Sequence, residues 1–461
     1  MKAAILPGLM LVLVACEVAG PAGPTPFAGD VLGSSGRPGA SDSVDASGVR
    51  PTPGAAFSPP STPVSLRLWH SWSGRNAEAF SRIVDAFNAE TPTVKISVDA
   101  HAAAEMQQQL AGATAPSQRP DIVVLDETRV AENAIAATVQ PVDDFAAGAG
   151  LSPDEYTSDV WNAGIWDGKR YGVPIDVHPE AMFWNKSVFR SAHLDPDNPP
   201  ADEHGFVDAI KEIRLRTGIP GYMVVGSGTE ARALEGPVFA SLFIQAGGKW
   251  TTPDFSAATY NDGAGVEAAD FLEDLVEDVK LSVVESGADR AAFRDGKNGM
   301  LFGGTSETRE FREALGNDLG VSVFPQIFGP GVWAGSHQLA LTVGVDGTKK
   351  AGAYAFIDWL SRHAVDLADA GEIPAASSIR EQLTGSGDDL DPLIAKVAPE
   401  VAEARLLPPI PGAADLLFLE SGAADAVVQV ITGRQDSTSA LDASVAHLTT
   451  ILRANRDKYG Y

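Results

Sequence analysis

The sequence predicts an α/β protein with two lobes, on three observations. The chain has 461 residues, 44% of them hydrophobic, so it can bury a sizeable core and form more than one domain. From Val64 onward, strand-like and helix-like stretches alternate in the order β-α-β-α-β, which is typical of a sheet with helical crossovers. The stretch Ile122–Leu125 is continuously apolar, as expected for a strand that is buried on both faces.

The N-terminal residues have the pattern of a secretory signal. Lys2 is followed by the apolar run Ala3–Ala15, which is shorter than the roughly 20 residues that a membrane-spanning helix needs. Leu13-Val14-Ala15-Cys16 resembles the lipobox of bacterial lipoproteins, in which the signal is cleaved before the cysteine and the cysteine is acylated. We therefore expect a signal peptide at 1–15 and an exported protein, anchored to the membrane through Cys16 and facing the periplasm or the cell exterior. An ordinary signal peptide with a chance cysteine is the alternative.

Residues 16–63 are expected to form the lipidated cysteine and a disordered tether. Between Glu17 and Pro63, 47 residues include 8 Gly, 9 Pro and 7 Ser, and large apolar side chains are scarce. Such a segment cannot bury enough apolar surface to fold.

Regular patterns then predict the elements of the folded part. Strands are expected at Val64–Trp69, Val94–Val98, Asp121–Asp126, Tyr171–Asp176, Gly299–Phe302, Gly320–Pro325 and Gln338–Val343. Helices are expected around Ala77–Phe87 and at His101–Ala113, Val207–Arg216, Pro237–Ala246, Val266–Val279 and Ala351–His363, before a mostly helical remainder.

Composition argues against several classes of function. The net charge of -27 disfavours nucleic acid and anionic lipid headgroups as partners. The single cysteine excludes a disulfide within the chain and a thiolate metal cluster. Neither a Gly-x-Ser-x-Gly elbow, a His-Glu-x-x-His helix nor a Walker loop occurs, so we expect neither catalysis nor a cofactor. A secreted glycoside hydrolase stays a weaker alternative, because 61 acidic residues always offer some pair of carboxylates.

Several motifs occur in a characteristic order along the folded part. They are Leu68–Asn88, Pro120–Val123, Val142–Phe145, Tyr171–Pro174 with Phe183–Phe189, Phe293–Gly304, Ala351–Leu360 and Gly433–Gln435. In this order and spacing the chain resembles the family 1 extracellular solute-binding proteins of ABC importers, the maltose-binding-like group. The resemblance implies a receptor that captures a mono- or oligosaccharide and delivers it to membrane permease subunits.

The resemblance also implies a two-lobe periplasmic-binding-protein-like fold of type II, with a ligand cleft between lobes that close by hinge motion. The chain would cross between the lobes near Asp176, near Phe324–Gln326 and near His363–Glu372. The N-terminal lobe would then comprise 64–176 and 326–363, and the C-terminal lobe 177–325 and 364–461.

The stretch Trp69-His70-Ser71-Trp72 is the first candidate ligand contact. It follows a strand, and open α/β sheets bind ligands at the carboxyl ends of their strands. A tryptophan ring can cover the apolar face of a sugar, while polar groups bond its hydroxyls. The competing interpretation places Trp69 in the core and leaves only Trp72 exposed.

The other candidate ligand contacts come from five places in the chain. They are Asp126 at a strand end, Asp176 and His178 at the first crossing, Gly304 and Thr305 in a small-residue loop, Trp333, Ser336 and His337 before a strand, and Glu372 at the third crossing. Structural alternatives exist for Asp126, which could cap a helix, and for Asp176 and His178, which could serve hinge geometry alone.

The identity of the ligand stays open at this level. A polyol, a glycerol phosphate ester or a polyamine are alternatives to a sugar, and Arg75 next to Gly74 keeps the phosphate option open. A metal-binding lipoprotein is a further alternative, since His70, His178 and His337 could converge. Their spacing in the sequence matches no metal motif, so we expect no metal site.

Overall fold

The computed structural model describes residues 57–113, 115–228, 230–383 and 391–461. The predicted signal peptide, Cys16 and the first part of the predicted tether lie outside these residues. Among the described helices, none combines the length and the apolarity that crossing a membrane requires.

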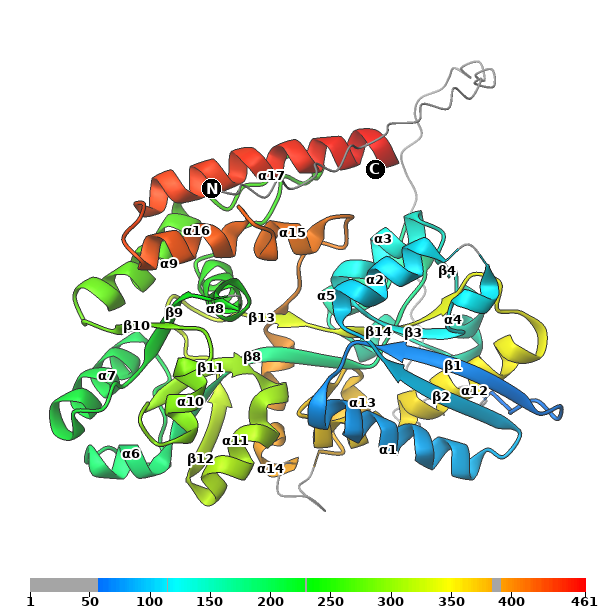
Figure 1. The fold of residues 1–461 in the computed structure, drawn as a ribbon, viewed down its shortest axis with the longest axis horizontal. Helices are drawn as coiled ribbons and strands as arrows, with labels where there is room; N and C mark the ends of the chain where they lie inside the picture. Colours follow the sequence, from blue (N-terminus) through cyan, green and yellow to red (C-terminus); the bar gives the residue numbers. More distant parts are fainter. Residues whose placement is uncertain (1–56, 114, 229, 384–390) are drawn as a thin grey trace, which may run out of the picture. The chain divides into compact units, whose positions relative to one another are not determined.

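The first lobe is built on a six-stranded mixed sheet (Figure 1). β1 (Val64–His70) pairs in parallel with β2 (Val94–Ala100) and with β3 (Ile122–Asp126), which confirms the predicted β-α-β-α-β opening. β14 (His337–Thr342) returns from far along the chain and pairs antiparallel with β3, so that His337 lies opposite Asp126. The sheet is completed by β4 (Val139–Gln140) and β7 (Val173–Pro174).

Helices cover both faces of this sheet. Because successive side chains of a strand point to opposite faces, Leu68 and Trp69 of β1 enter different cores. Leu68 packs beneath α1 (Gly74–Glu90) and α12 (Gly347–His363), whereas Trp69 packs beneath α2 (Ala103–Gly112). The lobe also contains α3 (Val130–Ile135) and α4 (Asp143–Ala149).

The periodicity of α1 shows why these helices form. Phe80, Ile83, Val84 and Phe87 recur at helical spacing and are all buried against the sheet. The helix ends at Glu90, just before Pro92, which restricts the preceding residue and offers no backbone N–H.

The second lobe is organised around one long strand. β8 (Asp176–Asn185) pairs antiparallel with β11 (Met300–Gly304), β12 (Leu319–Val323), β13 (Val332–Gly335) and β15 (Ile373–Pro374). β16 (Ala404–Arg405) pairs in parallel with β13. A single large apolar core joins this sheet to its helices. These helices are α6 (Lys186–Ser191), α7 (Glu203–Thr217), α8 (Ala231–Gln245), α9 (Gly263–Glu277), α10 (Ala288–Arg294), α11 (Thr308–Leu315), α14 (Asp391–Val397), α15 (Ala413–Phe418), α16 (Ala423–Ile431) and α17 (Ser437–Tyr459).

Six small strands and α-helices remain in the described part of the chain, one of which is the short helix α13 (Ser377–Arg380) after β15. A separate two-stranded ladder pairs β9 (Met223–Ser227) with β10 (Ser282–Glu285), and a second pairs β5 (Ile165–Trp166) with β6 (Lys169–Arg170). The helix α5 (Ser158–Ala163) precedes β5 and contributes Val160 and Ala163 to the second-lobe core.

Within the described part of the chain, three segments connect the two lobes. The chain passes between the two sheets at Ile175, at Ser336 and next to Glu372. The second passage was expected near Phe324–Gln326, and that expectation is wrong. Val332–Gly335 forms β13 and pairs with β8 and β16, so the chain stays in the second lobe about ten residues longer. In Figure 1, β8 and the β13–β14 segment run side by side between the two lobes.

Two lobe boundaries also differ from those expected. Ala364 and Leu367, in the 3-10 helix η6 (Ala364–Ala370), are buried in the first-lobe core, so this lobe extends beyond His363. At the other end, Phe57 was expected in the tether. Its ring instead stacks on Phe145 with centroids 5.0 Å apart, because an apolar recess on the first lobe accepts it. Residues 57–63 therefore belong to the folded part.

Candidate functional site

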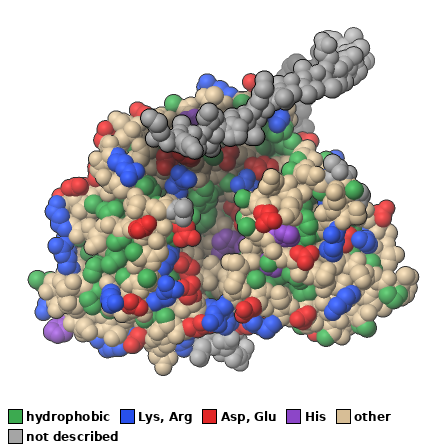
Figure 2. All heavy atoms as spheres, in the orientation of Figure 1, with side chains coloured by type: hydrophobic (Ala, Val, Ile, Leu, Met, Phe, Trp, Pro, Cys, Tyr) green, Lys and Arg blue, Asp and Glu red, His purple; other side chains and the backbone are tan. Residues whose placement is uncertain are grey.

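A cleft of about 530 Å³ lies where the two lobes meet. This volume falls within the range of about 300–1,000 Å³ that is typical of small-molecule sites. The first lobe lines it with Ala103, Ala104, Gln107, Asp126, Glu127, Thr128 and Arg129, and the second lobe with His178, Trp333, Gly335, Ala414 and Phe418. Figure 2 shows a groove on this face, with histidine and acidic side chains along it.

The first-lobe wall carries two adjacent carboxylates of different exposure. Asp126 ends β3, and its side chain is 40% exposed and makes no capping hydrogen bond to the following helical turn. Glu127 is buried, and its Oε2 accepts the backbone N–H of Ser336 at 2.9 Å. Burial raises the pKa of Glu127 to about 7, and the nearby charge of Asp126 adds to this effect. Arg129 lies in an ion pair with Glu132 at 2.9 Å.

The second-lobe wall supplies the aromatic surface. Trp333 is half-buried, and its ring lies 6.0 Å from that of Phe418 in an edge-on arrangement. The indole Nε1 of Trp333 has no hydrogen-bond partner among the described residues. A flat apolar face together with carboxylates is suited to a ligand that has both C–H surfaces and hydroxyl groups.

The Trp69–Trp72 stretch lies beside the cleft but does not line it. Trp69 is buried and its ring contacts that of His101 at 4.5 Å. Trp72 was expected to be exposed, but it is only 9% exposed and packs against Phe80 and His337. Ser71 is half-buried.

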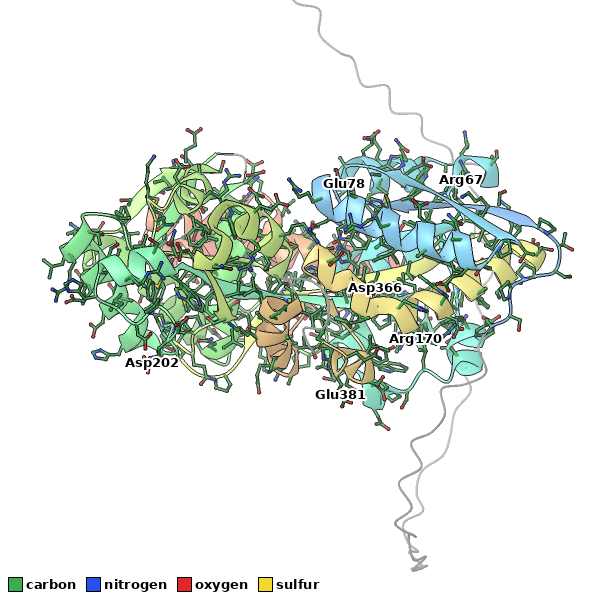
Figure 3. All side chains as sticks on the ribbon, turned by 90° about the horizontal axis from the view of Figure 1, so that it is seen from below. Arg67, Glu78, Arg170, Asp202, Asp366 and Glu381 are labelled. Atoms are coloured by element: carbon green, nitrogen blue, oxygen red, sulfur yellow. The ribbon has the colours of Figure 1, made fainter. Side chains whose placement is uncertain are left out.

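The loop therefore closes the apolar core where β1 turns into α1. His70 is also buried; burial lowers its pKa to about 4, and the charges of His337 and His101 act in the same direction. The exposed face of α1, with Glu78, lies on the outer side of this region (Figure 3).

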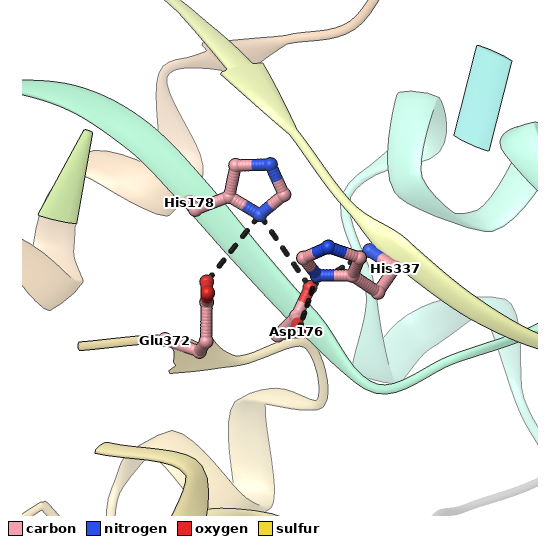
Figure 4. A group of neighbouring side chains, drawn as sticks. All are labelled: Asp176, His178, His337 and Glu372. Atoms are coloured by element: carbon pink, nitrogen blue, oxygen red, sulfur yellow. Dashed lines mark hydrogen bonds and ion pairs between the residues drawn. The ribbon is translucent and has the colours of Figure 1, made fainter. Parts of the chain in front are cut away.

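Four other predicted residues converge on the hinge. Asp176, His178, His337 and Glu372 form one group, which we call the hinge cluster, and their ligand atoms all lie within 4.8 Å of one another (Figure 4). Asp176 accepts the backbone N–H of His337 and bonds His337 Nδ1, both at 2.8 Å. His178 Nδ1 lies 3.6 Å from Asp176 Oδ1 and 3.4 Å from Glu372 Oε2. Ser336, which was also predicted as a ligand contact, instead donates from Oγ to the backbone carbonyl of Asp176 at 2.8 Å and so stabilises the cluster.

The ionisable groups of the hinge cluster shift one another's pKa values. Burial alone would raise the pKa of Asp176, but the charge of His337, its hydrogen bond and the close imidazole of His178 outweigh it and hold that pKa well below its usual value. Burial would likewise lower the pKa of His337, but Asp176 outweighs it and raises that pKa. Burial and the charge of Asp176 raise the pKa of Glu372.

Gly304 and Thr305 do not line the cleft. Gly304 ends β11, and Thr305 is fully buried beneath the turn at Gly371, where an added Cβ would collide with the Thr305 carbonyl. This loop packs against the third connecting segment, so its small residues allow close backbone contact within the hinge.

Sequence reasoning missed several cleft residues. Asp126 was singled out from the sequence, but Glu127, Gln107, Arg129 and Phe418 were not. A polar run directly after the carboxyl end of a buried strand could have pointed to Glu127 and Arg129. No local pattern distinguishes Phe418, because it reaches the cleft only through the packing of the C-terminal helices.

Comparison with known proteins assigns the family. The model of the family described as "Bacterial extracellular solute-binding protein" matches residues 82–382, well over half of the chain. The chain belongs to this family. The family consists of binding proteins rather than enzymes and is extracellular by its description.

Two curated relatives match part of the chain. An uncharacterized ABC transporter extracellular-binding protein of Pyrococcus horikoshii is 26% identical over 165 residues, which is 35% of this chain and 37% of that protein. The sn-glycerol-3-phosphate-binding periplasmic protein of Escherichia coli is 26% identical over 164 residues, 34% of this chain and 37% of that protein. The chain thus aligns with little more than a third of the length of these relatives.

One solved structure has the same fold as this chain along its whole length. The cyclic alpha-maltosyl-1,6-maltose binding protein from Arthrobacter globiformis has a TM-score of 0.71 and 24% identity, covering 85% of this chain and 100% of that one. The two-lobe fold predicted from the sequence is confirmed.

Proposed function

We propose that this protein is the substrate-binding receptor of an ABC importer and that it captures a mono- or oligosaccharide in the cleft between its lobes. One observation carries the proposal: Trp333 and Phe418 form an aromatic wall that faces the carboxylates of Asp126 and Glu127 across a space of about 530 Å³. Aromatic rings cover the C–H faces of a sugar, and carboxylate oxygens accept bonds from its hydroxyls. The carbohydrate ligand in the printed name of the Arthrobacter globiformis protein agrees with this ligand class.

The cleft suits a neutral sugar better than a phosphate ester. Among the described residues that line it, Arg129 is the only arginine or lysine, and Glu132 already pairs with it. Asp126 and Glu127 would repel a phosphate at the same wall. Recognition of a phosphate normally uses an arginine fork or a helix N-terminus without such neighbouring carboxylates.

The remaining parts of the proposal concern delivery. The acylated Cys16 would hold the protein at the membrane, and the tether would let it diffuse near the surface. Binding of the sugar would bring the lobes together by movement at the three connecting segments. The closed form would then dock on permease subunits, and the sugar would pass on without bond chemistry.

Isothermal titration with linear and cyclic maltooligosaccharides, monosaccharides and sn-glycerol 3-phosphate tests the proposal. We expect saturable binding of at least one sugar class, with the sugar recovered unchanged. Trp333→Ala and Asp126→Asn should each weaken binding at least tenfold, about 1.4 kcal/mol. Trp166→Ala is the matched control, because Trp166 contacts Tyr461 and does not line the cleft.

Two outcomes would overturn the sugar assignment. One is tight binding of sn-glycerol 3-phosphate with no response to any sugar. The other is sugar binding that Trp333→Ala and Asp126→Asn leave at the wild-type affinity, which would place the ligand elsewhere.

A further inference from the structure

The hinge cluster contains four potential metal ligands that sugar binding does not explain. Asp176, His337 and Glu372 are 0%, 7% and 1% exposed, so a ligand in the cleft cannot reach them. Only His178 lines the cleft. Two imidazoles and two carboxylates are thus gathered in the interior, where isolated charges are costly unless they are paired or bind a metal ion.

Two of these ligand atoms form no hydrogen bond within the described part of the chain. Among the described residues, Glu372 Oε2 and His178 Nδ1 are buried atoms that form no hydrogen bond; they face each other at an ion-pair distance of 3.4 Å. Asp176 Oδ1, which accepts the backbone N–H of His337, lies 3.6 Å from His178 Nδ1. Buried polar atoms that stay unpaired in a native structure call for an explanation, and an ion is one of the usual ones.

We propose that Asp176, His178, His337 and Glu372 form a binding site for a divalent transition-metal ion, best suited to zinc, that joins the three segments connecting the lobes. Zinc is held in proteins by imidazole nitrogens and carboxylate oxygens, most often by four ligands in a tetrahedron. Two neutral imidazoles and two carboxylates also balance its charge of two within a buried site.

The contacts of His178 are close to those that a metal site requires, whereas the four ligand atoms as a set lie within 4.8 Å of one another and would move closer together around an ion. A tetrahedral ion with ligands at about 2.0–2.1 Å has ligand-to-ligand edges of about 3.3 Å. The two contacts of His178 Nδ1, at 3.4 and 3.6 Å, match this value. His337 Nδ1 and Asp176 Oδ2 stand closer, at 2.8 Å, and would separate by about half an ångström as an ion replaces the proton between them.

Neighbouring residues fit a metal site as well. Gly335 lies against the His178 ring, where an added Cβ would stand 2.2 Å from Nε2, so the absence of a side chain leaves room for this imidazole. On the other histidine, His337 Nε2 points toward the Asp126 carboxylate at 3.9 Å. A carboxylate near the second nitrogen of a metal-bound histidine orients the ring and raises its basicity.

Such an ion would act on the hinge rather than on the ligand. Asp176 and His178 come from the first connecting segment, His337 follows the second, and Glu372 belongs to the third. One ion would therefore link all three segments and restrict their relative movement. This role is independent of the chemistry of the transported solute.

Titration of the full chain with ZnCl₂ after treatment with a chelator tests the site, followed by calorimetry and by thermal unfolding. We expect one saturable site per chain and a rise of the unfolding midpoint with zinc, because an ion that binds only the folded state stabilises it. His178→Ala and Glu372→Gln should each weaken zinc binding at least tenfold while the zinc-free proteins still unfold cooperatively. Cobalt in place of zinc should give the visible spectrum of a tetrahedral centre.

His204→Ala is the matched control, because His204 forms an exposed pair with Asp208 that could also attract zinc. Zinc binding that is lost in His204→Ala, that survives in both cluster variants, or that fails to saturate would overturn the proposal. Sugar titration of the same proteins separates the two proposals: a chain that binds zinc but no sugar refutes only the proposed function, and the reverse result refutes only the metal site.

Discussion

Two buried carboxylates lie on either side of Ser336, one in the cleft wall and one in the hinge cluster, and their pKa values shift in opposite directions. Glu127 accepts the Ser336 backbone N–H, while Ser336 Oγ donates to the backbone carbonyl of Asp176. The pKa of Glu127 is raised to about 7, whereas that of Asp176 is held well below its usual value. The difference lies in the partners: Asp176 contacts two imidazoles, and Glu127 has a second carboxylate, Asp126, as its nearest charged neighbour in the chain.

This contrast predicts opposite dependences of stability on pH. The folded pKa of Asp176 is lowered, so its contribution is present above the unfolded value near 4 and is lost as the pH falls through the folded value. The folded pKa of Glu127 is raised from about 4.5 to about 7. Between these two pH values, the folded state therefore keeps a proton that the unfolded state has lost. Stability due to Glu127 therefore falls as the pH rises from about 5 to 7.

The largest expected effect comes from removing the charge of the hinge cluster. Asp176→Ala leaves the Nδ1 and backbone N–H of His337 without their partner, and breaking a buried charge pair costs about 3–5 kcal/mol. Urea unfolding at pH 7 measures this loss. Asp126→Ala is the control: Asp126 is half-exposed, so we expect a change within about 0.5 kcal/mol. Equal losses in the two variants would contradict the distinction between wall and hinge.

A smaller effect of opposite sign is expected at the cleft wall. Glu127→Gln keeps an acceptor for the Ser336 N–H without a charge, so the variant should be more stable than the wild type at pH 8, by up to about 3 kcal/mol. At pH 4.5 the two proteins should differ little, because Glu127 is then protonated in the folded state and still about half protonated in the unfolded state. Unfolding free energies between pH 4.5 and 8 measure the divergence.

Glu78→Gln is the control for this series, because Glu78 is exposed on α1. It should change the pH dependence by no more than a few tenths of a kcal/mol. A Glu127→Gln protein whose stability runs parallel to the wild type at all pH values would mean that Glu127 is ionised at no cost in the folded protein.

The smallest effect is expected at the surface. Arg75 of α1 pairs with Glu313 of α11 at 2.7 Å and joins the two lobes, but their side chains are 58% and 42% exposed. Exposed pairs contribute about 0–1 kcal/mol and are screened by salt, so Arg75→Ala should lower stability by at most about 0.5 kcal/mol. Denaturation in low and high salt measures it. A loss as large as that of Asp176→Ala would show that surface contacts, and not the hinge cluster, hold the lobes together.

The local elements of the first lobe follow from the sequence. The apolar spacing in α1 and the continuous apolar run of β3 reflect burial within a few residues of chain, so each can be recognised without a partner. The second connection was misplaced for the opposite reason. Val332–Gly335 is a strand only because β8 and β16 flank it, and both lie far away in the sequence.

The candidate site was predictable residue by residue but not as an arrangement. Asp176, His178, His337 and Glu372 were each proposed as ligand contacts, yet the fold buries most of them together at the hinge. Trp72 was expected to face the ligand and instead completes the core beside His337. Glu127 was not singled out because its importance comes from burial, which adjacent residues do not reveal.

The sequence by itself determined the order of strands and helices, the alternation that places Leu68 and Trp69 on opposite faces, and the family resemblance that the family model confirms. Only the tertiary structure decided which polar residues face the cleft and which meet at the hinge. The physical reason is the separation along the sequence between the interacting groups. Periodic burial is set by neighbours a few residues apart, whereas the His337–Asp176 contact joins groups 161 residues apart, whose pKa values depend on the fold that brings them together.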